Sequence, residues 1–135
     1  MIVVVSYGVI LRDNVLNAAP CINIHPSALP KYRGPSPIRT AILNGDKQMD
    51  VCLMNMTAEM DAGDILMRKN IAIDENDTNE TVETKVSNVA IEMLNEYLKN
   101  SEKYVAQPQS GEPSFTRKFT GDDEIIDWKK YIMLM

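Results

Sequence analysis

Short apolar runs separated by chain breaks dominate the first part of the sequence and predict strands. The opening run, residues 1–5, is rich in β-branched side chains and is typical of a buried strand, which Ser6-Tyr7-Gly8 ends. Residues 21–25 predict a second strand. Two further apolar runs predict strands over 50–56 and 65–73.

Between the second and third predicted strands, the sequence predicts a proline-rich loop and then a short helix. Four of the seven prolines fall within residues 26–37. Ser36 suits the N-cap and Pro37 the first helical position, because proline needs no N–H donor there. The helix body is expected over 38–43, with Gly45 after its end.

A long amphipathic pattern over 78–99 predicts the main helix. Asp77 with Glu80 resembles a capping box, although Ser or Thr is the usual cap. The apolar side chains repeat every three or four positions, so they are expected to form one face that packs on the core. These side chains are Val82, Val86, Val89, Ala90, Met93, Leu94, Tyr97 and Leu98.

The order strand, loop, helix, strand, strand, helix predicts an α/β fold with a mixed, mostly parallel sheet and flanking helices. In such sheets, ligands bind beyond the carboxyl ends of the parallel strands. The periodic pattern fades after Asn100, and prolines and a glycine make residues 107–114 linker-like. We therefore expect one domain over 1–106, followed over 107–135 by a linker and the start of another unit.

The composition places limits on class and compartment. The 135 residues, 44% apolar and 24% charged, fit one globular domain. No apolar run is long enough to cross a bilayer and no secretory signal is evident, so we expect a cytoplasmic protein without a membrane partner. Cys21 and Cys52 belong to no Cys-x-x-Cys motif and are expected to be reduced, partly buried thiols.

The net charge of −5 disfavours broad contact with the phosphates of nucleic acids. The basic side chains that cluster in the sequence are Lys31, Arg33 and Arg39. We therefore expect no DNA partner and, from this stretch alone, a poor RNA-binding surface.

Asn23 and His25, the only histidine, lie two positions apart on a predicted strand, so their side chains point to the same face. An amide donor beside an imidazole suits a carbonyl that becomes an oxyanion, because the amide holds the oxygen and the imidazole donates or moves a proton. On spacing alone, a structural role for a lone histidine at a strand end is the stronger alternative.

The sequence Asp61-Ala62-Gly63-Asp64 follows a predicted strand and is the sharpest acidic feature. A carboxylate there could orient or deprotonate a partner, and a solvated turn is the simpler alternative because glycine permits it. A metal site is disfavoured, since two aspartates three positions apart without other ligand residues make a weak pattern.

Two further loop features leave alternatives open. Arg33-Gly34 fits either an anion contact or ordinary loop chemistry. Tyr7 with the apolar run 9–11 fits either a flat apolar pocket for a heteroaromatic ring or ordinary core packing.

Residues 21–42, CINIHPSALPKYRGPSPIRTAI, resemble the signature of the 10-formyltetrahydrofolate-dependent formyltransferases. That signature is Asn-x-His, a Ser-Leu-Leu-Pro-like run, Arg-Gly, a proline and then a helix. Residues 51–66, VCLMNMTAEMDAGDIL, resemble the family's strand and Asp loop. With residues 3–11 and 115–128, the resemblance covers most of 2–128.

The resemblance also has departures. Ala28 stands where the family usually has leucine, and Thr57 and Glu59 stand where it tends to have Asp and Gly. Glycine adopts a positive φ that Glu avoids, so the resemblance does not carry the conformation of the loop before Asp61. The family has further β-α units before the segment that matches 1–5 and a β-rich basic domain after the segment that matches 115–128. The resemblance therefore implies a partial Rossmann-like fold, the C-terminal half of a catalytic domain, truncated at both ends.

The roles that the resemblance implies are specific to residues. Asn23 would hold the formyl oxygen, and His25 would stabilise the developing oxyanion and assist proton transfer. Asp61 would orient His25 or a water and take up the proton of the acceptor amine, which attacks directly without a covalent enzyme adduct. The implied formyl donor is 10-formyltetrahydrofolate, with no metal. The implied folate contacts are Tyr7, Gly8, Ile10, Leu11, Ser27, Ala28, Leu29 and Pro30, and the implied substrate contacts are Arg33 and Gly34.

The resemblance points to methionyl-tRNA as the acceptor, which implies formylation of initiator tRNA in translation initiation. One alternative is a sugar nucleotide or another small amine as the acceptor. Another is a catalytically inactive remnant or a folate-binding fragment, because the resemblance implies missing flanks. For these 135 residues alone we expect little or no transfer to tRNA.

Overall fold

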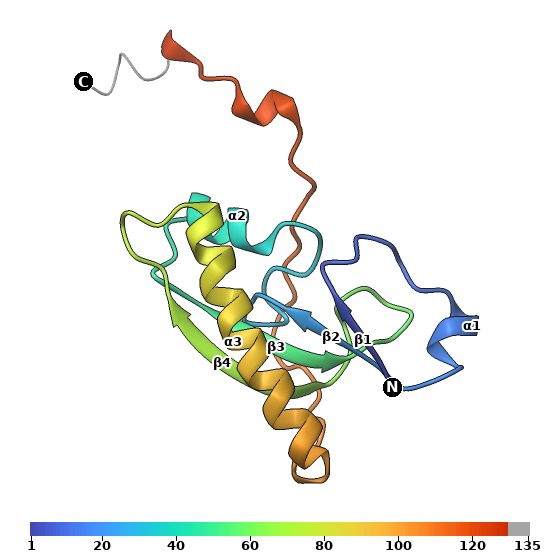
Figure 1. Ribbon diagram of the computed structural model, residues 1–135. Helices are drawn as coiled ribbons and strands as arrows, with labels where there is room; N and C mark the ends of the chain where they lie inside the picture. Colours follow the sequence, from blue (N-terminus) through green and yellow to red (C-terminus); the bar gives the residue numbers. More distant parts are fainter. Residues whose placement is uncertain (130–135) are drawn as a thin grey trace.

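The computed structural model describes residues 1–129, so the last part of the segment predicted over 107–135 lies outside the described residues. A four-stranded sheet forms the centre, and the longest helix packs across one of its faces (Figure 1). The elements in order are β1 Ile2–Val5, α1 Asp13–Leu16, β2 Cys21–His25, α2 Pro37–Leu43, β3 Gln48–Asn55, β4 Ile65–Ala72, α3 Asn79–Asn100 and the 3₁₀ turns η1 Ser101–Lys103 and η2 Gly121–Glu124.

The sheet has the order β1-β2-β3-β4 and is mixed, but it is not mostly parallel as predicted. Among the strands of the described residues, only β1 and β2 run parallel, whereas β2–β3 and β3–β4 are antiparallel. A parallel neighbour needs a connection long enough to return along the sheet. The loop over 56–64 is too short for that. The connection over 26–47 is long enough to return, so its length does not explain the antiparallel pairing of β3 with β2; in the structure β3 starts beyond the end of β2, with Cys52 opposite His25.

Strand β1 forms where it was predicted, but it is half exposed rather than buried. It lies at the edge of the sheet, and Val3 and Val5 are 38% and 53% exposed. Helix α3 packs against β3, β4 and α2 and leaves one face of β1 exposed. The apolar sequence of β1 therefore predicts a strand, but it does not predict whether another element buries that strand.

Helix α3 buries most of the predicted face. Val82, Val86, Ala90 and Met93 are buried against the sheet, whereas Leu98, in the last turn, is 52% exposed and contradicts the prediction. The last turn extends past the sheet, so it lacks a surface to cover it (Figure 1).

The predicted capping pair of α3 is wrong by one residue. Thr78 is the N-cap, its hydroxyl accepts from the Thr81 N–H, and the Thr81 hydroxyl accepts from the Thr78 N–H. This reciprocal pair satisfies two N–H groups that the first turn leaves without helical partners. Asp77 instead accepts from the Asp74 N–H and from Lys85.

The start of α2 agrees with the prediction in position. Ser36 is the N-cap residue and Pro37 comes first, although the Ser36 side chain makes no capping bond. The backbone N–H of Ser36 donates to the Thr116 hydroxyl instead, 3.0 Å away. Gly45, with φ +71°, follows the end of the helix as predicted.

After α3 and η1, the chain returns along the sheet before it leaves the body toward η2 (Figure 1). Residues 107–116, called the return segment below, pair with two parts of the body. The backbone of Gln107 exchanges two hydrogen bonds with Ile65, at 2.8 and 2.9 Å. Arg33 donates to the Ser114 carbonyl and accepts from the Thr116 N–H, at 2.8 and 2.7 Å. The predicted division at 106/107 remains a prediction.

Both cysteines are free, as predicted, and both are more fully buried than the partly buried thiols predicted. Burial raises the pKa of the Cys52 thiol, which donates to the Ser27 carbonyl. Among the helices of residues 1–129, none combines the length and apolar character that crossing a membrane requires.

Candidate active site

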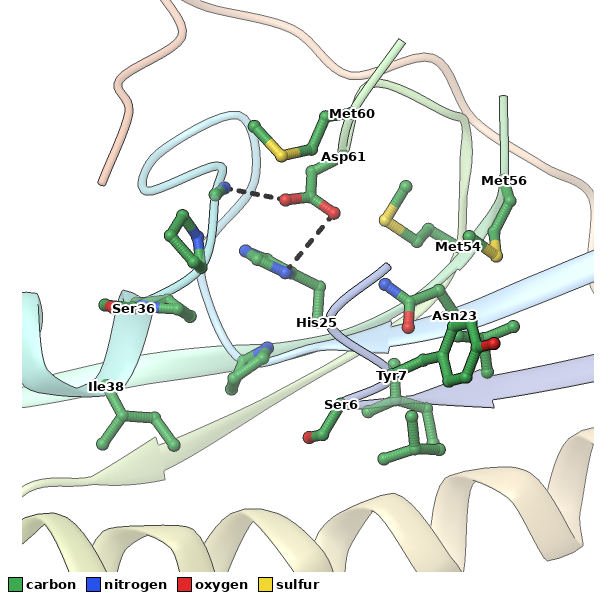
Figure 2. Close-up of a pocket in the computed structure, with 18 of the residues that line it drawn as sticks. Ser6, Tyr7, Asn23, His25, Ser36, Ile38, Met54, Met56, Met60 and Asp61 are labelled. Atoms are coloured by element: carbon green, nitrogen blue, oxygen red, sulfur yellow. Dashed lines mark hydrogen bonds and ion pairs between the residues drawn. The ribbon is translucent and has the colours of Figure 1, made fainter. Parts of the chain in front are cut away.

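A cavity of about 550 Å³ opens at the carboxyl ends of the parallel pair β1 and β2, where the sequence places a ligand site (Figure 2). Its apolar wall comes largely from the loop after β1 and from the methionines of the β3–β4 region. The residues predicted as folate contacts in the first loop all line it, and they are Tyr7, Gly8, Ile10 and Leu11.

Asn23 and His25 both face this cavity, as their spacing on β2 predicts (Figure 2). His25 is buried, with 5% exposure, whereas Asn23 is only partly buried. Within residues 1–129, no group hydrogen-bonds the Asn23 side-chain amide. Its N–H donors are therefore available to a carbonyl oxygen in the cavity.

The two ring nitrogens of His25 have different partners. Nε2 lies 2.9 Å from the Tyr32 carbonyl oxygen. A carbonyl can only accept, so Nε2 carries a proton and donates it there. Nδ1 faces the Asp61 carboxylate, with 3.6 Å between Nδ1 and Oδ1, an ion pair when the ring is protonated. Asp61 thus lies beside His25, and the role that the resemblance implies for Asp61 in orienting His25 remains a prediction.

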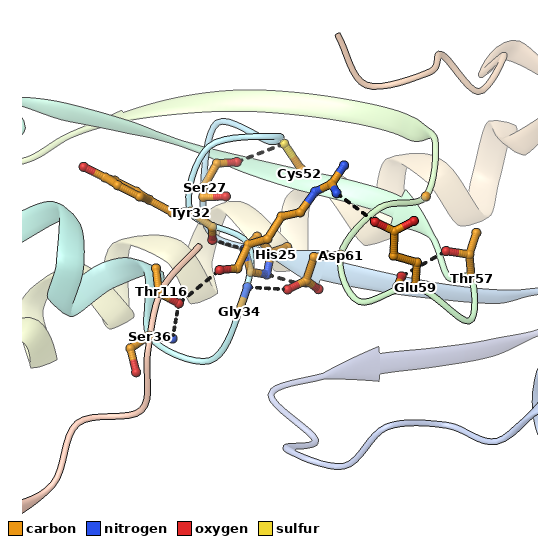
Figure 3. Close-up of polar contacts among 12 residues, drawn as sticks. His25, Ser27, Tyr32, Gly34, Ser36, Cys52, Thr57, Glu59, Asp61 and Thr116 are labelled. Carbon is orange, nitrogen blue, oxygen red and sulfur yellow. Dashed lines mark hydrogen bonds and ion pairs between the residues drawn. The ribbon is translucent and has the colours of Figure 1, made fainter. Parts of the chain in front are cut away.

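Asp61 is held by the backbone as well as by His25. Its Oδ2 accepts from the Gly34 N–H at 2.7 Å, so one carboxylate oxygen faces the end of strand β2 and the other faces the β2–α2 loop (Figure 3). Asp61 itself has the left-handed φ of +53°. Glu59, the departure from the family pattern, is not among the residues with positive φ, so the strained position in this loop is Asp61.

The structure does not bring every predicted site residue into the cavity. Arg33 is buried, but its guanidinium donates to Gln109 and to Glu59. Gly34 does line the cavity. Ser27 to Pro30 lie outside the cavity lining, with Ser27 and Leu29 fully or almost fully buried. Their assignment to folate remains a prediction.

Sequence reasoning missed several residues around the site. Met54, Met56 and Met60 line the cavity. Met54 pairs with Asn23 across β2 and β3, so the alternation of β3 carried a signal for Met54 and Met56. Gln109, in the predicted linker over 107–114, and Thr116, in the predicted start of another unit, also approach the site, and no periodic pattern marks them.

In the described part of the chain, no three His, Cys, Asp or Glu side chains come together as a metal ion would require. The cavity thus offers an amide, an imidazole and a carboxylate at the rim of an apolar wall. This set can hold a carbonyl oxygen, balance a positive charge on the imidazole and accept a proton from an attacking group.

The chain is similar in sequence to known formyltransferases. The Formyl transferase family model matches residues 1–98. The methionyl-tRNA formyltransferase of Francisella tularensis subsp. novicida (strain U112) is 42% identical over 132 residues, which are 96% of this chain and 42% of that protein. The methionyl-tRNA formyltransferase of Rickettsia bellii (strain RML369-C) is 39% identical over 132 residues, 96% of this chain and 43% of that protein.

Solved structures share the fold. A methionyl-tRNA formyltransferase from Clostridium thermocellum has a TM-score of 0.80 at 21% identity over 96% of this chain and 59% of its own. A sugar N-formyltransferase from Shewanella sp FDAARGOS_354 has a TM-score of 0.74 at 28% identity, over 84% of this chain and 47% of its own. HypX from Aquifex aeolicus, solved in complex with tetrahydrofolic acid, has a TM-score of 0.84 at 22% identity, over 95% of this chain and 23% of its own. The chain spans about two fifths of the length of the curated relatives. By its match over residues 1–98, the chain belongs to the formyl transferase family.

Proposed function

We propose that this chain carries the formyl-transfer site of a methionyl-tRNA formyltransferase, with 10-formyltetrahydrofolate as the formyl donor. The observation that carries the proposal is the convergence of Asn23, His25 and Asp61 on one cavity. The curated relatives that are 42% and 39% identical over 96% of this chain are methionyl-tRNA formyltransferases, which favours methionyl-tRNA over a sugar nucleotide as the acceptor. A cytoplasmic location remains the prediction from sequence.

The cavity fits a folate in size and chemistry. Its volume of about 550 Å³ is in the range of small-molecule sites. Tyr7 and the apolar residues after it supply a wall for a flat heteroaromatic ring, and Asn23 and His25 lie at the end where a formyl group would react. HypX, which shares this fold, was solved in complex with tetrahydrofolic acid.

When bound, 10-formyltetrahydrofolate supplies the formyl group. The Asn23 amide donates a hydrogen bond to the formyl oxygen, where negative charge grows during attack. Because Nε2 of His25 is committed to Tyr32, the ring nitrogen left to act in the cavity is Nδ1. Nδ1 of the neutral ring accepts the proton that the attacking amine loses, and Asp61 stabilises the imidazolium ion that results. Return of this proton to N10 of the folate lets tetrahydrofolate leave as the bond between N10 and the formyl carbon breaks.

We assign to this chain the recognition of the acceptor's amine and not of the tRNA phosphates. Lys31 pairs with Asp46, at 2.8 Å, and Arg33 is buried. Two of the three basic side chains noted in the sequence are therefore engaged within the fold, which limits the phosphate contacts they could make.

The test measures formyl transfer from 10-formyltetrahydrofolate to charged initiator tRNA and, in parallel, to an amino sugar nucleotide. We expect low turnover for tRNA with the 135 residues alone, reduced about 100-fold or more in Asp61→Asn, since proton transfer by a positioned group contributes about 10²-fold to 10⁴-fold. His25→Ala should also abolish it.

Asp64→Asn is the matched control, because Asp64 lies exposed in the same loop and outside the cavity lining. It should change the rate less than about 2-fold. Transfer to the amino sugar nucleotide and not to tRNA would show that the acceptor is a sugar nucleotide and not methionyl-tRNA. No transfer to either acceptor, with binding of a folate retained, would favour the folate-binding remnant.

A further inference from the structure

Gln109, in the return segment, uses all the hydrogen-bonding capacity of its side-chain amide at the candidate active site. Its Nε2 donates to the carbonyl oxygens of Asp61 and Gly63, at 2.7 and 2.9 Å. Its Oε1 accepts from the Nε and Nη2 atoms of Arg33, at 3.3 and 2.9 Å. An amide offers two donors and one oxygen with two lone pairs, so this side chain is fully satisfied.

One of the two carbonyls that Gln109 binds belongs to Asp61, the strained residue of this loop, and the other lies two residues later at Gly63. Asp61 has a φ of +53°, a conformation that a side chain normally avoids and that persists only where the surroundings impose it. The same residue presents its carboxylate to Gly34 and His25. A contact that fixes the Asp61 backbone therefore also fixes the carboxylate.

Gln109 is itself held in place from three sides. Toward the N-terminus, Gln107 pairs with Ile65 through two backbone bonds. Toward the C-terminus, Ser114 and Thr116 pair with the backbone of Arg33. The Arg33 side chain, with 8% exposure for the residue, donates to the Gln109 oxygen. Gln109 thus joins the β2–α2 loop to the β3–β4 loop.

We propose that Gln109 is a positioning residue that holds the Asp61 carboxylate against His25 and so makes the return segment part of the transfer site. The effect on transfer rests on the proposed function, whereas the effect on the position of Asp61 does not. Gln109 touches neither the formyl group nor the amine; it acts through the Asp61 loop.

The decisive variant is Gln109→Glu. It has the same length and keeps an acceptor for Arg33, but it has no donor for the Asp61 and Gly63 carbonyls. Gln107→Glu is the matched control, because Gln107 is exposed in the same segment and, among the described residues, its side chain hydrogen-bonds only the nearby Val105 carbonyl. Gln109→Met, of similar length without a polar amide, serves if the charge prevents folding.

Two readouts separate positioning from general stability. The Gly34 amide signal reports its bond to the Asp61 carboxylate, and the ¹⁵N signals of His25, the only histidine, report the ring. In Gln109→Glu both should move toward their values in Asp61→Asn, while Gln107→Glu leaves them in place. Turnover should fall about 10-fold to 100-fold with less than about 2-fold change in KM for the folate, since small displacements of catalytic groups act on the chemical step.

Unchanged Gly34 and His25 signals in Gln109→Glu and Gln109→Met would overturn the proposal, as would moved signals with undiminished turnover. If the parent chain neither transfers a formyl group nor binds a folate, the proposed function fails, and the Gly34 and His25 signals still decide whether Gln109 positions Asp61.

Discussion

Gly63 is required by the close approach of the Asp61 loop to the backbone of β3. A Cβ at this position would lie 1.8 Å from the Asn55 carbonyl oxygen and 2.8 Å from its carbon. These are backbone atoms of a paired strand, so they cannot rotate away as a flexible side chain could. The absence of a side chain at Gly63 lets the loop lie flat on β3 with Asp61 above His25.

Gly63→Ala should therefore lower the free energy of unfolding by about 1–3 kcal/mol, as forced overpacking does. Gly121→Ala is the control, because a Cβ there would meet no atom of the described residues within 4 Å and the φ of Gly121 is not positive. Denaturant titration of both variants makes the comparison. Equal midpoints for the two would contradict the close contact at Gly63.

At the start of α3, Asp77 lies among several groups that favour its charged form. The Asp77 carboxylate accepts from Lys85, from the Asp74 N–H and from the Thr81 hydroxyl. These partners, Lys85 first, lower the pKa of Asp77 from 3.8 to about 2. A carboxyl whose pKa is lower in the folded state stabilises the fold above its unfolded pKa, and this contribution is lost as pH falls.

The free energy of unfolding should consequently decline between about pH 4 and pH 2, and Asp77→Asn should flatten that part of the pH profile. Glu75→Gln is a matched control, since it removes a carboxylate from the same turn. The ion pair of the Glu75 carboxylate with Lys47 is long, at 3.9 Å. Chemical denaturation at several pH values provides the profile. The same slope in Asp77→Asn and the parent chain would argue against this role.

The return segment joins the last part of the described chain to two earlier segments. Its residues pair with Arg33 in the β2–α2 loop and with Ile65 at the start of β4. Gly34, with φ +111°, lies so close to Thr116 that a Cβ would be 2.8 Å from the Thr116 carbonyl oxygen. Arg33 obtains its buried hydrogen bonds from Gln109. A chain without these residues would leave a buried guanidinium without its amide partner.

Ending the chain after Ala106 should lower the free energy of unfolding by about 2 kcal/mol or more, because a buried charged group loses its partner. A chain that ends after Thr120 keeps the return segment and loses mainly the exposed Arg117–Asp123 pair, so it should stay within about 1 kcal/mol of the parent. Thermal and denaturant unfolding of both would measure this. Similar losses in the two would place the return segment outside the stable unit and support the division at 106/107.

Local sequence patterns predicted the elements well where neighbouring residues decide them. The strand over 21–25 and the start of the helix at Pro37 appear as predicted, since alternation, proline and a cap act within a few residues. The capping pair of α3 was wrong by one residue because Asp77 and Thr78 both suit a cap, and the competing contacts of Asp77 with Lys85 decide between them.

In the candidate site too, local sequence patterns predicted some features and could not predict others. The spacing of Asn23 and His25 was enough to place both on one face, because a strand has a period of two. The pairing of His25 with Asp61 was expected from the family resemblance, not from spacing. The role of Arg33 as an internal contact, and the contact of Gln109 with the Asp61 loop, had no sequence signal.

The amino-acid order alone was sufficient for the strands, the two main helices and the shared face of Asn23 and His25, because these depend on short-range periodicity and capping. The tertiary structure decided the antiparallel pairing of β2 with β3, the exposure of β1 and the contacts among His25, Asp61 and Gln109. Those features depend on packing between residues far apart in the chain, and no local period records which distant loops will meet.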